Sequence, residues 1–227
     1  LSSWPQSTLT PPADPARKVS DVRFSPDARY LAVASADGVI YLFDAAGSEG
    51  GDGAGSYSEV ARCCGHSSAV THLDWTTTSD VLRSNDQGHE LRFWDVPTGE
   101  AISVASACRD LPWASARVTL GYHCQGIFRN RADGTGVHAI DGSDDGGLLV
   151  TADDLGQINL FRNPCVRASG NPDKPGHPNR KSFAAHASAA LDCRWARDGG
   201  GGACVVSAGG FDLALMQWKR VPPPPPP

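Results

Sequence analysis

Several features that would assign this chain to a familiar class are missing from its 227 residues. No apolar run approaches the ~18 residues that a membrane-spanning helix needs, so we expect no membrane insertion. The start, LSSWPQSTLTPP, has neither an initiator Met nor a charged-then-apolar signal pattern, and we expect it to be cut from a longer chain. A formal net charge of −5 gives no general attraction for nucleic acid or anionic lipid, so neither is an expected partner.

The sequence also has little that indicates a metal or a reaction centre. Its seven cysteines are odd in number and form no C-x-x-C pair, which favours reduced, buried thiols in an intracellular protein. The group Cys63-Cys64-x-His66 has metal-binding side chains, but His66 has a different expected role. The acidic stretch that begins at Asp141 imitates a calcium loop, yet its twelfth position is Ala152 instead of a bidentate Glu. We therefore expect no metal, no cofactor and no catalytic residues, and the chain is not predicted to be an enzyme.

What the chain does have is a repeated strand pattern. Glycine and proline together contribute 42 residues, which favours short strands joined by turns. Residues 64–75, CGHSSAVTHLDW, place a Gly-His pair before an alternating apolar run, and Phe93-Trp94-Asp95 closes a later strand. Similar aromatic strand ends occur at Phe43, Phe161 and Trp218, and the four lie 51, 67 and 57 residues apart. This pattern is typical of WD-repeat blades, each made of four antiparallel strands.

The pattern predicts an all-β, WD-repeat β-propeller of about four blades. We expect a linker or the tail of a preceding blade over 1–17, blades over 18–63, 64–107, 108–181 and 182–221, and a polyproline tail over 222–227. The second blade should have an outer strand near 100–106. The third should begin near 118–121 and 126–129, with a long loop over 163–181. A four-blade ring is possible, but the irregular third blade and the lack of a closing device favour the C-terminal part of a larger propeller.

A WD blade is tied together by a hydrogen-bonded chain of a loop His, a strand Ser, a turn Asp and a strand Trp, which satisfies their buried polar groups. The fourth blade has all four members: His186, Ser207, Asp212 and Trp218. The second blade has three of them: His66, Ser84 and Trp94. Gly88 occupies the position expected for the Asp, so we expect an incomplete network there. These residues are predicted to be structural.

Longer stretches of the chain resemble one family in detail. They are the Gly-His-Ser-Ser…His-Leu-Asp-Trp opening, Trp113…Leu120-Gly121…Gly126, Asp153-Asp154-x-Gly156…Leu160-Phe161, and the ending Met216-Gln217-Trp218. Over roughly residues 17–221 the chain resembles the C-terminal propeller of the echinoderm microtubule-associated-protein-like (EMAP-like) family. The resemblance implies two joined propellers, of which this chain would be about the last third. It also implies association with tubulin or microtubules, and some relatives belong to cilia and flagella.

The functional hypothesis is a non-enzymatic, microtubule-associated scaffold in the cytoplasm and cytoskeleton, including the axoneme of a cilium or flagellum. Its expected partners are tubulin, other cytoskeletal or axonemal proteins, and the remaining blades of the protein. Because tubulin presents acidic surfaces, basic loops are the candidate contacts: Arg129, Arg131, Arg180 and Lys181. The alternative is a general WD-repeat adaptor in a signalling or ubiquitin-ligase complex.

Overall fold

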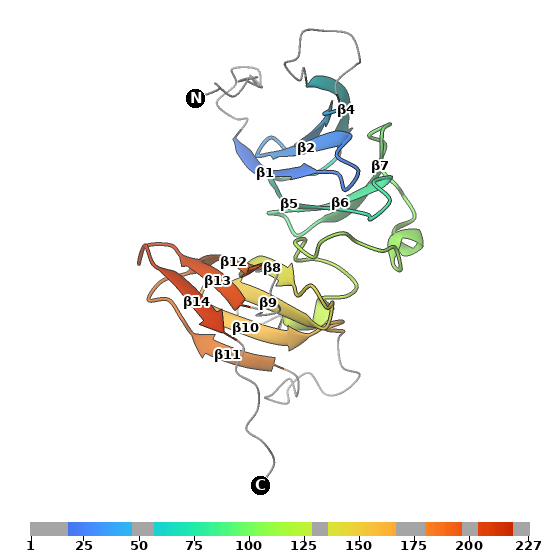
Figure 1. The fold of residues 1–227 in the computed structure, drawn as a ribbon. Coiled ribbons are helices and arrows are strands. Elements are labelled where there is room, and N and C mark those ends of the chain that lie inside the picture. Colours follow the sequence, from blue (N-terminus) through green and yellow to red (C-terminus); the bar gives the residue numbers. More distant parts are fainter. Residues whose placement is uncertain (1–17, 47–56, 129–135, 167–179, 197–203, 220–227) are drawn as a thin grey trace, which may run out of the picture. The chain divides into compact units, whose positions relative to one another are not determined.

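The computed structural model describes residues 18–46, 57–128, 136–166, 180–196 and 204–219. These residues form four antiparallel sheets, so the all-β prediction is confirmed (Figure 1). The chain divides into two compact units, Leu1–Leu120 and Gly121–Pro227. Each unit contains two of the sheets.

The first unit holds blade 1 and blade 2, which are the sheets β1–β4 and β5–β7. Blade 1 has strands in sequential order: β1 Val19–Phe24, β2 Tyr30–Ser35, β3 Val39–Asp44 and β4 Ser58–Cys64. Blade 2 has three strands: β5 Val70–Trp75, β6 Val81–Asp86 and β7 Leu91–Asp95. The short 3-10 helix η1, Ala105–Cys108, follows β7.

The second unit holds blade 3 and blade 4, which are the sheets β8–β11 and β12–β14. It begins with a second 3-10 helix, η2, at Gln125–Ile127. Blade 3 has four strands: β8 Val137–Gly142, β9 Leu148–Asp153, β10 Gln157–Arg162 and β11 Arg180–Ala184. Blade 4 has three: β12 Ala190–Ala196, β13 Cys204–Gly209 and β14 Leu215–Lys219.

The first strand of every blade carries the same irregularity. The pairing register shifts between its first and third residues, at Val19/Asp21, Val70/His72, Val137/Ala139 and Ala190/Asp192. Because side chains alternate along a strand, this shared bulge assigns equivalent positions to the same face in all four blades. The four first strands can therefore be compared position by position.

Apolar side chains between neighbouring blades form two separate cores, one in each unit. In the first unit, Ala34, Ile40 and Leu42 of blade 1 pack with Leu73 and Trp94 of blade 2, and all five are fully buried. In the second unit the core joins blade 3 to blade 4, with these buried members: Ala139, Val150, Ala152, Ile158, Ala190, Cys193 and Val205. Each blade is thus stabilised mainly by covering a face of its neighbour.

Two turn glycines allow the blades to approach closely. Gly38, between β2 and β3, has φ +80°, and a Cβ there would lie 2.9 Å from the carbonyl oxygen of His66. Gly156, between β9 and β10, has φ +71°, and its Cβ would overlap the carbonyl oxygens of His186 and Ser188. Both turns need glycine for its backbone conformation and because the next blade's Gly-His or Ala-His loop lies against them.

Most strands lie where the sequence predicts them, but the ends of blades 2 and 3 do not. The outer strand expected near 100–106 is wrong, since this stretch holds an isolated bridge between Trp94 and Ala101 and then η1. The strands expected near 118–121 and 126–129 are also wrong, because η2 lies there and the first strand of blade 3 is β8. The loop expected over 163–181 ends in β11, which pairs with β10.

Among the described residues, no helix has the length and apolar character that a bilayer crossing requires. All seven cysteines are free thiols; Cys64 is exposed and the other six are buried. Burial, with a smaller contribution from the neighbouring Cys64, raises the pKa of Cys63 to about 12. The prediction of reduced, buried thiols is therefore confirmed for every cysteine except Cys64.

Candidate functional site

Blade 4 contains a continuous polar chain across its strands. His186 Nδ1 lies 2.9 Å from Asp212 Oδ2, and His186 Nε2 lies 2.9 Å from Ser207 Oγ. The Trp218 indole N–H donates to the same Ser207 Oγ at 3.0 Å. With the imidazole proton on Nδ1, the Ser207 hydroxyl donates to Nε2 and accepts from the indole, so every polar group has a partner. The four residues that the sequence groups together are brought together here.

Blade 2 repeats this chain with a carboxylate from another position. Trp94 Nε1 donates to Ser84 Oγ at 2.8 Å, and His66 Nε2 lies 2.6 Å from the same oxygen. His66 Nδ1 faces Asp86 Oδ2 at 3.2 Å, although the two atoms lack the alignment of a hydrogen bond. Blade 2 therefore has a carboxylate beside the His66 ring in spite of Gly88, but its network is incomplete as expected, because the His–Asp hydrogen bond is missing.

The strand registers explain the exchange. Asp86 pairs with Val70, and at the equivalent place in blade 4 Gly209 pairs with Ala190. A Cβ on Gly209 would overlap the Asp212 carboxylate and lie 2.5 Å from His186 Nδ1. The side chain of a residue at this strand position thus points to the place that the turn carboxylate occupies in blade 4. Sequence reasoning missed Asp86 because it placed the Asp at a fixed offset before the Trp.

Electrostatics in the two networks follow burial and hydrogen bonding. Burial lowers the pKa of His66, against the opposing effect of the nearby Asp86 carboxylate, so the imidazole is held neutral. Desolvation acts to raise the pKa of Asp212, but N–H groups of Ala214 and Ala187 and the His186 ring outweigh it, and the net shift is downward. The pKa of the buried His66 ring is thus lowered in blade 2, and the pKa of the hydrogen-bonded Asp212 carboxyl is lowered in blade 4.

Each network has the Ser-His-Asp order of a nucleophilic triad, but neither can act as one. Ser84 is 0 % exposed and Ser207 is 1 % exposed, so no substrate carbonyl can reach either hydroxyl oxygen. Each oxygen also accepts a Trp indole N–H, which uses a lone pair that a nucleophile would need. The arrangement can hold strands together; it cannot perform acyl transfer.

A metal is the other chemistry to test in blade 2. One ligand atom each from His66, Asp86 and Glu90 lies within 4.8 Å of the others. The His66 ring, however, already faces Ser84 and Asp86, and Glu90 Oε2 accepts from the Arg92 guanidinium at 3.2 Å. His66 Nδ1 and Asp86 Oδ2 make no hydrogen bond within the described residues, but the Glu90 carboxylate is already held by Arg92, so we assign no ion to these three residues.

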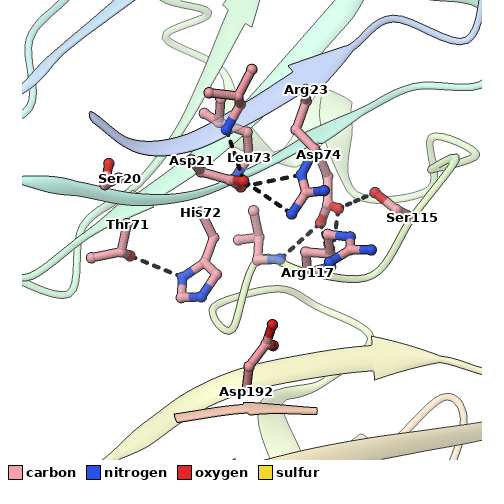
Figure 2. Close-up of polar contacts among 12 residues, drawn as sticks. Ser20, Asp21, Arg23, Thr71, His72, Leu73, Asp74, Ser115, Arg117 and Asp192 are labelled. Carbon is pink, nitrogen blue, oxygen red and sulfur yellow. Dashed lines mark hydrogen bonds and ion pairs between the residues drawn. The ribbon is translucent and has the colours of Figure 1, made fainter. Parts of the chain in front are cut away.

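A buried ion pair that the sequence did not single out anchors the irregular end of the first unit. Asp74 and Arg83, 0 % and 3 % exposed at their side chains, pair at 2.7 Å. The Asp74 carboxylate also accepts from the Ser115 hydroxyl and from the backbone N–H groups of Arg117 and Val118, at 3.0 and 2.9 Å (Figure 2). This carboxylate therefore fastens the segment after η1 to blade 2, where a regular outer strand was expected. Asp74 and Trp75 end the repeat pattern at residues 64–75, but nothing in the sequence indicated which residues Asp74 would contact.

Carboxylates on first strands also join one blade to the next. Asp21 Oδ2 accepts from the backbone N–H of Leu73 at 3.1 Å (Figure 2). The Trp75 indole donates to the Arg23 carbonyl oxygen at 3.3 Å. In the second unit, Asp141 Oδ2 accepts from the backbone N–H of Trp195 at 2.9 Å. The same kind of contact thus occurs between blades 1 and 2 and between blades 3 and 4.

The four basic candidates have different surroundings. Arg129 and Arg131 lie outside the described residues. Arg180 is in β11, where its guanidinium donates to Asn159 Oδ1 at 2.6 and 3.0 Å and to Gln157 Oε1 at 3.2 Å. Lys181 is exposed on the same strand. The expectation that Arg180 and Lys181 lie in a loop is wrong, because both belong to a strand edge.

Sheets of three or four antiparallel strands, joined by repeated first-strand contacts and His-Ser-Trp chains, define a WD-type β-propeller. The family model for the echinoderm microtubule-associated protein second beta-propeller matches residues 6–220. The chain therefore belongs to the echinoderm microtubule-associated protein family, and the resemblance seen in the sequence is confirmed.

Individual relatives support the same assignment. The 77 kDa echinoderm microtubule-associated protein of Strongylocentrotus purpuratus is 38% identical over 218 residues, 95% of this chain and 29% of that protein. Human echinoderm microtubule-associated protein-like 2 is 35% identical over 204 residues, 90% of this chain and 29% of the relative. Human echinoderm microtubule-associated protein-like 3 is 36% identical over 203 residues, which are 89% of this chain and 21% of that relative. The chain thus spans less than a third of the length of these relatives.

Proposed function

We propose that this chain is a non-enzymatic, microtubule-associated propeller segment that contacts tubulin through blade surfaces. The observation that carries the proposal is the family membership, because the relatives are named as microtubule-associated proteins. The buried Ser-His-Asp chains support a structural role for the repeat residues, since their hydroxyls are sealed from solvent. Its place would be the cytoskeleton, including axonemal microtubules.

The β11 edge of blade 3 is the contact surface that we propose within the described residues. Lys181 is exposed there and free to meet an acidic surface, whereas Arg180 is held by Asn159 and Gln157 and orders the strand. Since the chain as a whole is negative, attraction to acidic tubulin has to be local and weak at one site. Repetition along the microtubule lattice would raise the apparent affinity.

The test is co-sedimentation of the purified chain with polymerised tubulin over a range of salt concentrations. We expect pelleting with microtubules that weakens as salt rises, because exposed ion pairs are screened. Lys181→Glu should reduce pelleting, while Lys219→Glu, the same change at an exposed site on β14, should not. No pelleting at low salt would contradict the proposal.

The same preparation distinguishes the alternative of a general adaptor. Chain immobilised on beads should retain tubulin from a cell extract. Retention of kinase or ubiquitin-ligase subunits without tubulin would favour the adaptor and reject the microtubule role. Equal retention of unpolymerised tubulin and microtubules would show that the lattice is not required.

A further inference from the structure

Strand β11 presents one serine beside two basic residues at the outer edge of blade 3. Ser182 is the middle residue of this strand and is exposed, with Arg180 and Lys181 before it and Phe183 after it. The sheet order β11-β10-β9-β8 places β11 outermost, so only one of its edges pairs with a strand that the structure describes (Figure 1). An outer strand with mostly exposed side chains has few contacts to lose, so it opens locally at low cost. The Ser182 hydroxyl is therefore accessible to an enzyme.

The Arg180 side chain extends along β11 to the place beside Ser182. Ser182 pairs with Asn159 across the two strands, and the next pair on the same face is Ala184 with Gln157. The Arg180 guanidinium donates to Asn159 Oδ1 at 2.6 and 3.0 Å and to Gln157 Oε1 at 3.2 Å. Because residues two apart on a strand share a face, and paired residues share it too, this guanidinium lies on the same side of the sheet as the Ser182 hydroxyl.

A phosphate on Ser182 would offer Arg180 a stronger acceptor than those it has at these distances, which are neutral amide oxygens. A phosphoserine has three strong acceptor oxygens and a charge of about −1.5 to −2. The planar guanidinium fork binds phosphate through two N–H groups, and such charge-assisted bonds are about twice as strong as neutral ones. Arg180 can therefore exchange the amide oxygens for the phosphate by rotating its side chain, with no change in the backbone.

Two other exposed strand serines provide the comparison. Ser58 begins β4, the outer strand of blade 1, but neither of the two residues before it is basic, and Glu59 follows it. Kinases select substrates partly by charge pattern, so a carboxylate beside the acceptor disfavours an enzyme that prefers basic neighbours. Ser20 of β1 does follow basic residues, but its hydroxyl donates to the Val70 carbonyl oxygen of blade 2. Ser182 thus combines basic neighbours with an outer strand.

We propose that Ser182 is a phosphorylation site for a serine kinase that selects basic residues before its acceptor, and that Arg180 binds the resulting phosphate. The γ-phosphoryl group of ATP passes to Ser182 Oγ. A new P–O bond forms as the bond to the ADP oxygen breaks, and the hydroxyl proton goes to the catalytic base of the kinase. Before the transfer, Arg180 and Lys181 provide the positive charge that the kinase recognises. After it, Arg180 holds the phosphate against β11.

The modified serine lies next to Lys181, the residue proposed above to meet tubulin. The phosphate cancels most of the positive charge of Arg180 and Lys181, and its effect reaches about 10 Å at moderate salt. We therefore expect phosphorylation to weaken binding to an acidic surface. This consequence rests on the proposed function, whereas the modification itself does not.

The test of the site incubates the 227-residue chain with ATP, Mg²⁺ and the catalytic subunit of cyclic-AMP-dependent protein kinase as the probe. Peptide mapping by mass spectrometry should find phosphate on Ser182 and none on Ser58. Lys181→Gln should slow the modification of Ser182, because it removes one of the two basic residues. Absence of phosphate from Ser182, or equal modification of Ser58, would overturn the proposal.

The role of Arg180 has its own measurement. In a phosphorus NMR titration of the phosphorylated chain, the pKa of phosphoserine 182 should lie about 1 unit below the ordinary value of about 6, because a guanidinium favours the dianion. The pKa should return to about 6 when urea unfolds the chain. The same pKa in the folded and unfolded chains would overturn the binding of the phosphate by Arg180.

Co-sedimentation with microtubules tests the consequence separately. At low salt, the phosphorylated chain should pellet less than the unmodified chain. Equal pelleting of the two forms would overturn the regulatory part of the proposal. Failure of both forms to pellet would contradict the proposed function, whereas the mass spectrum would still decide the modification of Ser182.

Discussion

The position of the blade 2 carboxylate gives the sharpest test of the network geometry. Asp86→Gly removes the carboxylate that faces His66 Nδ1 and that accepts the Glu90 N–H at 2.8 Å. It leaves a fully buried imidazole without an acid, which costs about 1–3 kcal/mol, and it places glycine in a strand, which costs about 0.5–1 kcal/mol more. We expect a total loss of about 1.5–4 kcal/mol in the free energy of unfolding, measured by urea denaturation.

A second change in the same background separates the carboxylate from the glycine effect. Asp86→Gly with Gly88→Asp recreates the Gly209 and Asp212 pattern of blade 4, and it should recover most of the hydrogen-bond part of the loss. Gly88→Asp alone should not stabilise the protein, because its Cβ would lie 3.4 Å from Asp86 Oδ1 and would bring two carboxylates together. Equal stability of Asp86→Gly and the double variant would refute the reasoning, as would stabilisation by Gly88→Asp alone.

Three further predictions concern other parts of the two units. Burial lowers the pKa of His66 in the folded protein, so below the ordinary histidine pKa of about 6.5 the unfolded chain binds more protons than the folded one. The free energy of unfolding should therefore fall as the pH drops through about 6.5 towards the pKa of the folded state. Urea titrations at several pH values should show this pH dependence, and His66→Gln should reduce it. Asp74→Ala leaves Arg83 buried without its acid and should cost about 3–5 kcal/mol in urea denaturation, whereas Asp110→Ala, at an exposed carboxylate, should be neutral. Gly156→Ala should lower the melting temperature far more than Gly146→Ala, since both have positive φ but only the Gly156 site lacks room for a Cβ; equal shifts would show that backbone conformation alone requires the glycine.

Strand positions could be predicted from the sequence where alternating apolar residues are bounded by turn residues, as for β1 and β10. β8 and β11 were missed for different reasons. β8, VHAIDG, follows an irregular segment that was itself interpreted as the start of the blade. β11, RKSFA, is an outer strand with mostly exposed side chains, so it has little apolar periodicity to detect.

The candidate site shows the same division between local and spatial information. The His186, Ser207, Asp212 and Trp218 chain could be predicted because its members recur at regular offsets. Asp86 could not be predicted in this way, because Ser84 and Trp94 are one position closer in the sequence than Ser207 and Trp218. The partners of Asp74 lie more than 40 residues away in an irregular segment, and only the folded chain brings them together.

The central claim is that this propeller segment acts on microtubules, and imaging decorated microtubules at side-chain resolution tests it most directly. The account predicts blade density on the tubulin wall, with the β11 edge of blade 3 at the contact. Microtubules that stay bare at saturating protein and low salt would contradict it.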